Sequence, residues 1–170
     1  TAIEFYILSE KEAILAGDEL QIGLAKMYKG NALSFIGEFS EASKEFQDAL
    51  QIFQKLKNIH YIISARSSLS DLYSQNLFYD EAKKERDEAI SLAEKFGSHG
   101  HLSAFYYNAA LDNQSQGDYK ASIANFKKAL NAGRKTDNPK FYEATPLTGL
   151  VIACSEINDI LKAEFYLREF

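Results

Sequence analysis

The sequence repeats itself every 40 positions, and small side chains mark each repeat. Ala42, Ala82 and Ser122 are each 40 positions apart, and Ala163 follows 41 positions after Ser122. An internal period of about 20 to 50 residues is typical of stacked supersecondary units, none of which buries its apolar face alone. The period therefore predicts a chain of repeated structural units.

Residues that cap helices recur with the same period. Aspartate, asparagine or serine stands at four positions with this spacing, namely Asp18, Asn58, Ser98 and Asn138. Such side chains accept hydrogen bonds from the free N–H groups at the start of a helix, so each position predicts a helix N-terminus. Gln21 completes a capping-box pattern with Asp18, and Pro139 is tolerated at the first position of a helix.

Each unit also contains a break near its middle, at Gly37, Leu77, Gly117 or Asn158. Glycine and asparagine readily take the left-handed conformation that ends a helix. Between the breaks, apolar residues recur at helical spacing, and no alternation typical of β-strands is present. We therefore predict an all-α fold, an α-α superhelix built from antiparallel helix pairs.

The breaks and caps predict about nine helices, at residues 2–16, 19–36, 40–56, 59–76, 80–96, 99–116, 120–135, 139–157 and 160–170. They form a half repeat at 1–17 followed by repeats at about 18–57, 58–97, 98–137 and 138–170. No linker or low-complexity tract interrupts them. We expect a single repeat domain, spanning 1–170, that is a segment of a longer protein.

The composition limits the class of partner. Of the 170 residues, 46% are hydrophobic and 25% are charged, as in folded rather than disordered chains. The 19 Lys and Arg residues are interspersed with 24 Asp and Glu residues, so we expect no nucleic-acid partner. The apolar stretches are too short for a membrane helix, which needs about 20 residues. A single cysteine, Cys154, excludes an internal disulfide.

No group of residues in the sequence points to catalysis, and we predict a protein with no enzymatic activity, no metal and no cofactor. The sequence contains neither a phosphate-binding glycine loop nor a helical zinc motif. His99 and His101 are too closely spaced on a helix to share a face as metal ligands. The acidic run from Asp80 to Glu88 alternates with basic residues, which is typical of a solvated helix face with weak ion pairs.

The segment from Gly117 to Leu130 resembles the tetratricopeptide-repeat family, with glycine, aromatic, small, aromatic and alanine-leucine residues in the family's order. The segment from Gly37 to Leu50 matches nearly as well, and the resemblance extends over the whole chain. The unit is longer than the family's usual repeat, as in relatives found in bacterial regulators. Leu77 and Arg86 depart from the family's glycine and aromatic residues, and Asn158 and Ile160 depart likewise in the last unit.

The resemblance implies a protein- or peptide-binding scaffold whose concave groove is lined by the first helix of every pair. The groove positions it implies are Met27, Asn31, Ser34, Phe35, Ser67, Asp71, Gln75, Tyr107, Asn108, Leu111, Gln114, Thr148 and Ile152. Family members that hold a terminal carboxylate use lysine, arginine and asparagine together. Only Asn31 and Asn108 match here, which argues against that role.

Two further expectations follow. The resemblance leaves open that the segment is the sensory or regulatory part of a bacterial signalling protein, either a histidine kinase or a peptide-responsive transcription regulator. Its location would be cytoplasmic, or periplasmic in a sensor kinase.

Apolar residues in the first and last helices predict association of the chain's ends, with other parts of the same protein or with a second copy. These residues are Ile3, Tyr6, Ile7, Phe165, Leu167 and Phe170.

Overall fold

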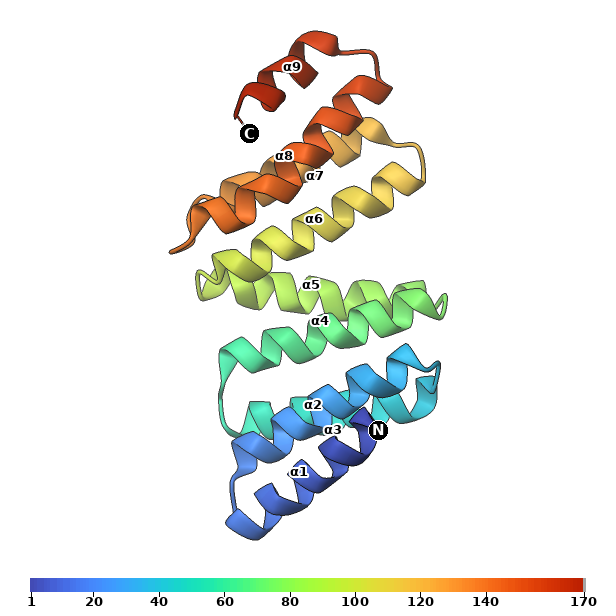
Figure 1. Ribbon diagram of the computed structural model, residues 1–170, viewed down its shortest axis with the longest axis vertical. Helices are drawn as coiled ribbons and strands as arrows, with labels where there is room; N and C mark the ends of the chain where they lie inside the picture. The colour runs from blue at the N-terminus through green and yellow to red at the C-terminus, as the bar shows by residue number, and fades with distance from the viewer. Residues whose placement is uncertain (170) are drawn as a thin grey trace. The chain divides into compact units, whose positions relative to one another are not determined.

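The computed structural model describes residues 1–169, and these form nine α-helices and no strand (Figure 1). The helices are α1 (Ala2–Ala16), α2 (Glu19–Phe35), α3 (Phe39–Lys55), α4 (Ile59–Gln75), α5 (Tyr79–Lys95), α6 (His99–Ser115), α7 (Tyr119–Gly133), α8 (Pro139–Glu156) and α9 (Ile160–Glu169). The predicted all-α fold and the number of helices are confirmed. Within the described residues, each expected boundary lies within two residues of the observed one, and the expected end of the last helix at residue 170 lies outside them.

The turns between helices depend on residues in the left-handed conformation. Such residues occur about every 20 positions, at Gly17, Gly37, Lys57, Leu77, Gly97, Gly117 and Asn158. The four breaks predicted in the middle of the units are therefore present. The other three lie between units, where the prediction depended on the capping residue that follows.

Two of the four predicted caps form. Asp18 accepts a hydrogen bond from the backbone N–H of Gln21 at 3.0 Å, and Asn58 accepts one from that of Tyr61 at 3.3 Å. Ser98 makes no cap bond, because its hydroxyl pairs with Nδ1 of His101 at 2.8 Å. Asn138 precedes α8 without a side-chain cap bond, so a helix begins after all four positions as predicted, but the capping hydrogen bond is absent at Ser98 and Asn138.

Contacts divide the chain into two compact units, and the boundary follows Leu92 inside α5. In the first unit α1 packs on α2, α2 on α3 and α3 on α4. In the second unit α6, α7, α8 and α9 pack in the same sequential order. Within each unit, consecutive helices run antiparallel and contact mainly their neighbours in the chain, which is the arrangement of a helical repeat protein (Figure 1).

The core of the first unit is built where small residues admit aromatic rings. Phe46 and Phe53 of α3 are fully buried. A Cβ atom added at Gly30 of α2 would lie 2.7 Å from the Phe46 ring, and one at Gly23 would lie 2.6 Å from the Phe53 ring. Glycine is therefore required at both positions for α2 and α3 to pack this closely.

The predicted small residues lie at close helix crossings in both units. Ala42, Ala82 and Ser122 are buried, and so is Ala163. The Ser70 hydroxyl of α4 donates a 2.9 Å hydrogen bond to the carbonyl of Ala82 in α5, which fixes the two backbones close together.

The core of the second unit surrounds Phe126 of α7. Its ring lies against Gly149 of α8, where an added Cβ would approach it to 2.4 Å, and beside the ring of Tyr107, with centroids 5.7 Å apart. Leu147, Leu150 and the free Cys154 complete this core. Within the described part of the chain, every helix falls short of the length and apolar character needed to cross a lipid bilayer.

Candidate binding surface

The first helices of neighbouring pairs contact each other within each unit. In the first unit α2 touches α4, and in the second unit α6 touches α8. The predicted groove residues lie on these four helices, so each unit offers a surface made by two first helices.

The surface of the first unit is mainly polar. Asn31 of α2 and Asp71 and Gln75 of α4 are exposed, and Ser34 and Ser67 are half-buried. The surface also has an apolar side chain, Phe35, which ends α2 and is 92% exposed. The polar side chains of this surface can exchange hydrogen bonds with an extended peptide backbone.

Met27 is a correction to the predicted groove. Its side chain is only 8% exposed and belongs to the hydrophobic core of the first unit, among Leu33, Phe46 and Leu69. Methionine at helical spacing fits a core as readily as a surface, because its flexible thioether fills irregular gaps. Met27 therefore stabilises the unit and offers little surface to a partner.

The surface of the second unit carries apolar groups. Leu111 of α6 and Ile152 of α8 are 42% and 46% exposed. Leu111 follows Asn31 in α2 and Asp71 in α4 at the 40-residue period, and Ile152 follows Leu111 by 41 positions, the offset that also separates Ala163 from Ser122. One repeat position thus changes from polar in the first unit to apolar in the second.

The other predicted residues of the second unit form a polar surround. Asn108 and Thr148 are exposed, and Gln114 is half-buried. Tyr107 is half-buried because its ring packs against Phe126, which leaves part of the side chain accessible. All four lie on α6 or α8, on which Leu111 and Ile152 also lie.

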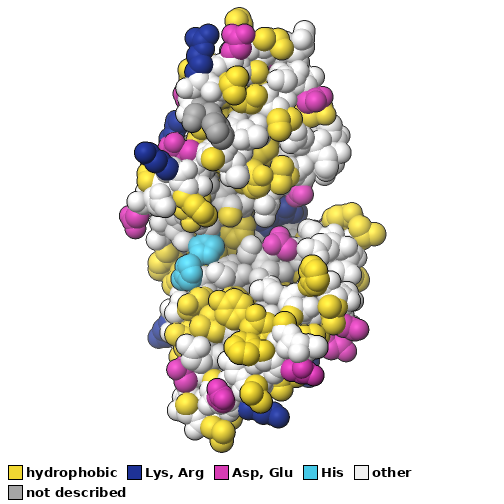
Figure 2. Space-filling model, in the orientation of Figure 1, with side chains coloured by type: hydrophobic (Ala, Val, Ile, Leu, Met, Phe, Trp, Pro, Cys, Tyr) yellow, Lys and Arg dark blue, Asp and Glu magenta, His cyan; other side chains and the backbone are white. Residues whose placement is uncertain are grey.

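A hollow between α1 and α2 was not predicted as a whole. It encloses about 240 Å³ and is lined by Phe5, Tyr6, Ser9, Gln21, Leu24, Ala25 and Tyr28. The rings of Tyr6 and Tyr28 are stacked with centroids 5.8 Å apart. Of these residues, Tyr6 was predicted to take part in association of the chain's ends, and Gln21 to complete a capping box. On the face seen in Figure 2, hydrophobic side chains gather over α1 and α2, near one end of the view.

A cluster of charges joins the first three helices, and it was not predicted from the sequence. Lys26 of α2 contacts Glu10 of α1 at 3.0 Å and, on α3, Glu45 at 3.4 Å and Asp48 at 3.2 Å. Lys29 contacts Glu45 at 2.7 Å. Burial would lower the pKa of Lys26, but the hydrogen bonds that its ammonium donates to Glu10 and Asp48, together with the charge of Glu45, outweigh burial and raise that pKa.

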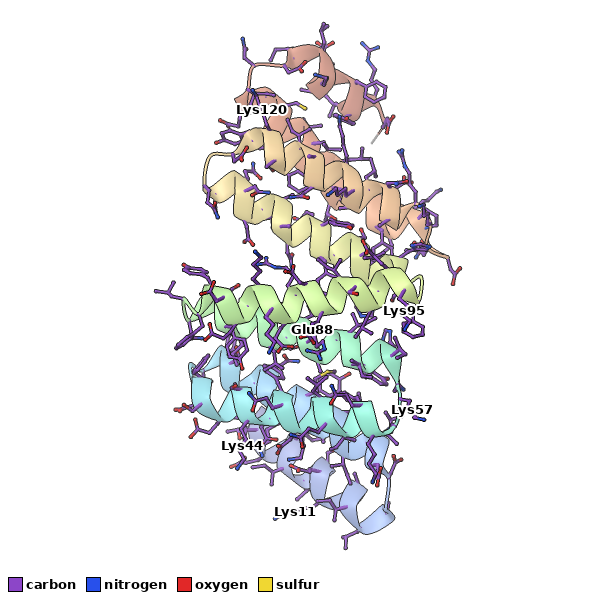
Figure 3. The ribbon with its side chains drawn as sticks, turned by 180° about the vertical axis from the view of Figure 1, so that it is seen from behind. Lys11, Lys44, Lys57, Glu88, Lys95 and Lys120 are labelled. Atoms are coloured by element: carbon purple, nitrogen blue, oxygen red, sulfur yellow. The ribbon has the colours of Figure 1, made fainter. Side chains whose placement is uncertain are left out.

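The same arrangement recurs one repeat later. Arg66 of α4 stands 40 positions after Lys26, and it pairs with Glu85 and, at 2.6 Å, with Glu88 of α5. Figure 3 shows Glu88 between α4 and α5. Glu85 and Glu88 follow Glu45 and Asp48 at the same interval. The acidic run in α5 is therefore not wholly solvated, because two of its members bind a cation from the preceding helix.

The described residues contain no cluster of three or more His, Cys, Asp or Glu side chains suited to a metal ion. Cys154 is fully buried, and burial raises the pKa of its thiol. A buried thiol with a raised pKa forms little thiolate, so Cys154 is a core residue with low reactivity.

At the chain's ends, Ile7, Phe165 and Leu167 are exposed, and Ile3 and Tyr6 are half-buried. Phe170, which was included in the same prediction, lies outside the described residues. The structure thus leaves apolar side chains accessible in α1 and in α9.

Comparison with known proteins supports the fold alone. No protein-family model matches the sequence, and no curated protein matches it. Among solved structures, the chain is similar to BtubC (BKLC) from P. vanneervenii, with a TM-score of 0.68 and 14% sequence identity. The match covers 99% of this chain and 87% of that chain. At this identity the likeness shows a shared fold and carries no information about function.

Proposed function

We propose that the chain is a peptide-binding scaffold of the tetratricopeptide-repeat type, which uses the surfaces of its first helices. The observation that carries the proposal is the pair Leu111 and Ile152, which expose large apolar side chains at equivalent positions of two contacting helices. Solvent exposure of such side chains is unfavourable, so their recurrence at one repeat position favours a role in binding. The 40-residue repeat and the order of the helices support the family assignment.

The chemistry of the second unit's surface indicates its ligand. An apolar side chain of a peptide would pack between Leu111 and Ile152, and Asn108, Gln114 and Thr148 would exchange hydrogen bonds with the peptide backbone around it. A central apolar contact within a polar surround is the usual arrangement of a protein interface. The polar surface of the first unit would bind a segment rich in hydrogen-bonding groups.

Selection of a random peptide library on the full chain tests this function. We expect selected peptides to share an apolar residue and to perturb the NMR signals of Asn31, Tyr107 and Gln114 before those of the second helices. The double variant Leu111→Ser, Ile152→Ser should weaken binding about tenfold or more.

Leu161→Ser is the matched control, because Leu161 of α9 is 82% exposed but lies outside the proposed surface. It should leave binding of the selected peptides unchanged. Failure to select any peptide, or equal loss of binding in Leu161→Ser and in the double variant, would reject the proposal.

A further inference from the structure

Helix α1 carries more exposed apolar surface than its packing explains. Only Ala13 of this helix is buried. Five of its large apolar side chains are exposed, namely Phe5 (67%), Ile7 (36%), Leu8 (59%), Ile14 (56%) and Leu15 (88%). All five side chains lie on α1, so a partner that covers them would contact this one helix of the first unit.

The repeat shows which of these positions ordinary packing leaves in solvent. Helix α3 is the second helix of the next pair, and it has α2 on one side and α4 on the other. Even so, Gln47, Gln54 and Lys55 of α3 remain exposed. These residues follow Ile7, Ile14 and Leu15 by 40 positions. A neighbouring helix of the repeat array would therefore leave Ile7, Ile14 and Leu15 in water.

The polar character of these positions is kept in later repeats. The corresponding residues are Asp87, Glu94 and Lys95 in α5, and Lys127, Arg134 and Lys135 in and after α7, all of them exposed. Leu8 also stands at a position that is polar in later repeats, but Asp48 and Glu88 there are half-buried and pair with Lys26 and Arg66 of the preceding helix, and only Lys128 is exposed. Helix α1 thus replaces polar residues with apolar ones on the side that faces away from its unit.

Two unpaired charges lie at the centre of this apolar side. Successive residues of an α-helix are rotated by about 100°, so Leu8 and Leu15 form a line on the side opposite the buried Ala13. Lys11 lies about 50° to one side of this line and Glu12 about 50° to the other. Both are exposed, and within the described residues neither makes an ion pair. Figure 3 shows Lys11 on α1 in the view from behind.

This charge pattern is complementary to a second copy of itself. In a two-fold pair of parallel helices, each helix places its left flank against its partner's right flank. Lys11 of each copy would then meet Glu12 of the other, on either side of Leu8 and Leu15. In an antiparallel two-fold pair, Lys11 would meet Lys11 and Glu12 would meet Glu12, which is unfavourable.

We propose that the chain forms a homodimer in which the outer faces of two α1 helices pack in parallel, with Leu8 and Leu15 at the centre and Lys11–Glu12 pairs at both margins. Such a dimer is one specific form of the association of the chain's ends that the sequence predicts, and it involves one face of α1. It is independent of the proposed peptide-binding function, because none of these residues lies on α2, α4, α6 or α8.

Sedimentation equilibrium of the full chain tests the dimer. The wild-type chain should show a concentration-dependent mass that reaches twice the monomer mass. The variant Leu8→Asp, Leu15→Lys carries the residues that α3 has at the equivalent positions, Asp48 and Lys55. We expect it to raise the dimer Kd about a hundredfold or more while helix content and thermal stability are retained.

Leu161→Lys is the control, since it removes an equally exposed apolar side chain from α9. It should leave the dimer Kd unchanged. A wild-type chain that stays monomeric at all concentrations, or a dimer that Leu8→Asp, Leu15→Lys does not weaken, would overturn the proposal, and the first outcome would assign this face to a different protein.

Charge exchange tests the parallel arrangement. Lys11→Glu and Glu12→Lys should each weaken the homodimer about tenfold, because each places like charges together. A mixture of the two variants should form heterodimers about as tight as the wild-type dimer, because every facing pair is then of opposite sign. Homodimers of both variants with no preference for the mixture would overturn the parallel pairing.

Discussion

Two serines, Ser70 and Ser122, occupy close helix crossings and differ in whether their hydroxyls are bonded. The Ser70 hydroxyl donates to the carbonyl of Ala82, whereas the Ser122 hydroxyl is fully buried and has no hydrogen-bond partner. The repeat places alanine at the position of Ser122 in the two preceding units, as Ala42 and Ala82. Burial of a polar group without a partner is unfavourable, so Ser122 is a local weakness of its unit.

We expect Ser122→Ala to stabilise the chain by about 1 kcal/mol and Ser70→Ala to destabilise it by about 1 kcal/mol. The first change removes an unbonded hydroxyl from the core, and the second removes a formed hydrogen bond of 2.9 Å. Urea unfolding of both variants measures the two free energies. Equal shifts in the same direction would contradict this account, because the chemical change is identical at the two sites.

Left-handed turns show what single residues could and could not reveal in the sequence. Gly37 and Gly117 were recognised because glycine is the residue that adopts this conformation at least cost. Lys57 adopts it too, with φ of 54°, and its side chain gives no local sign of this. Its conformation follows from its place between two packed helices, and only the regular spacing of the turns could have indicated it.

At the scale of helices, the spacing of apolar and capping residues predicted every helix, but not the ion pairs between helices. Capping at Asp18 and Asn58 depends on the residues next to them, so it could be predicted. The pairing of Lys26 with Glu45 depends on how α2 meets α3. The signal was present in the sequence, since Arg66 and Glu85 repeat that combination one period later.

The charged cluster around Lys26 predicts a measurable difference between two lysines. Lys26 has three acidic partners, and its side chain is 18% exposed, whereas Lys55 pairs with Glu19 and is 69% exposed. Lys26→Met should destabilise the chain by about 1–3 kcal/mol, because Glu10 and Glu45 would then pair with Lys29 alone and Asp48 would lose its contact with Lys26.

Lys55→Met is the matched control and should change stability by less than about 0.5 kcal/mol, as is usual for an exposed pair. Thermal unfolding at low and high salt measures both effects. The loss in Lys26→Met should persist in high salt, because its partners are partly buried. Equal effects of the two substitutions would show that burial of the cluster does not contribute.

At the scale of the whole chain, stability is carried by contacts between consecutive helices in each unit. The fold could be predicted because a 40-residue period implies repeated helix pairs, in which each helix packs on the next helix in the chain. The surfaces could be predicted only in part. The apolar face of α1 is visible only when α1 is compared with α3, whose exposed positions show where the repeat requires no cover.

Local contacts of this kind predict that damage to one unit stays within it. An added Cβ at Gly149 would lie 2.4 Å from the ring of Phe126, so Gly149→Ala should overpack the core of the second unit and cost about 1–3 kcal/mol. In chains whose units contact only their neighbours, such a loss acts first on the adjacent helices. Hydrogen exchange should therefore accelerate in α6 to α9 more than in α1 to α3.

Gly30→Ala supplies the reciprocal experiment, because its Cβ would lie 2.7 Å from Phe46 in the core of the first unit. It should accelerate exchange in α1 to α3 more than in α7 to α9. A uniform acceleration over all helices in both variants would mean that the chain unfolds as one cooperative body. The opposite patterns would instead show that each compact unit holds its own stability, with Phe46 and Phe126 as the two centres.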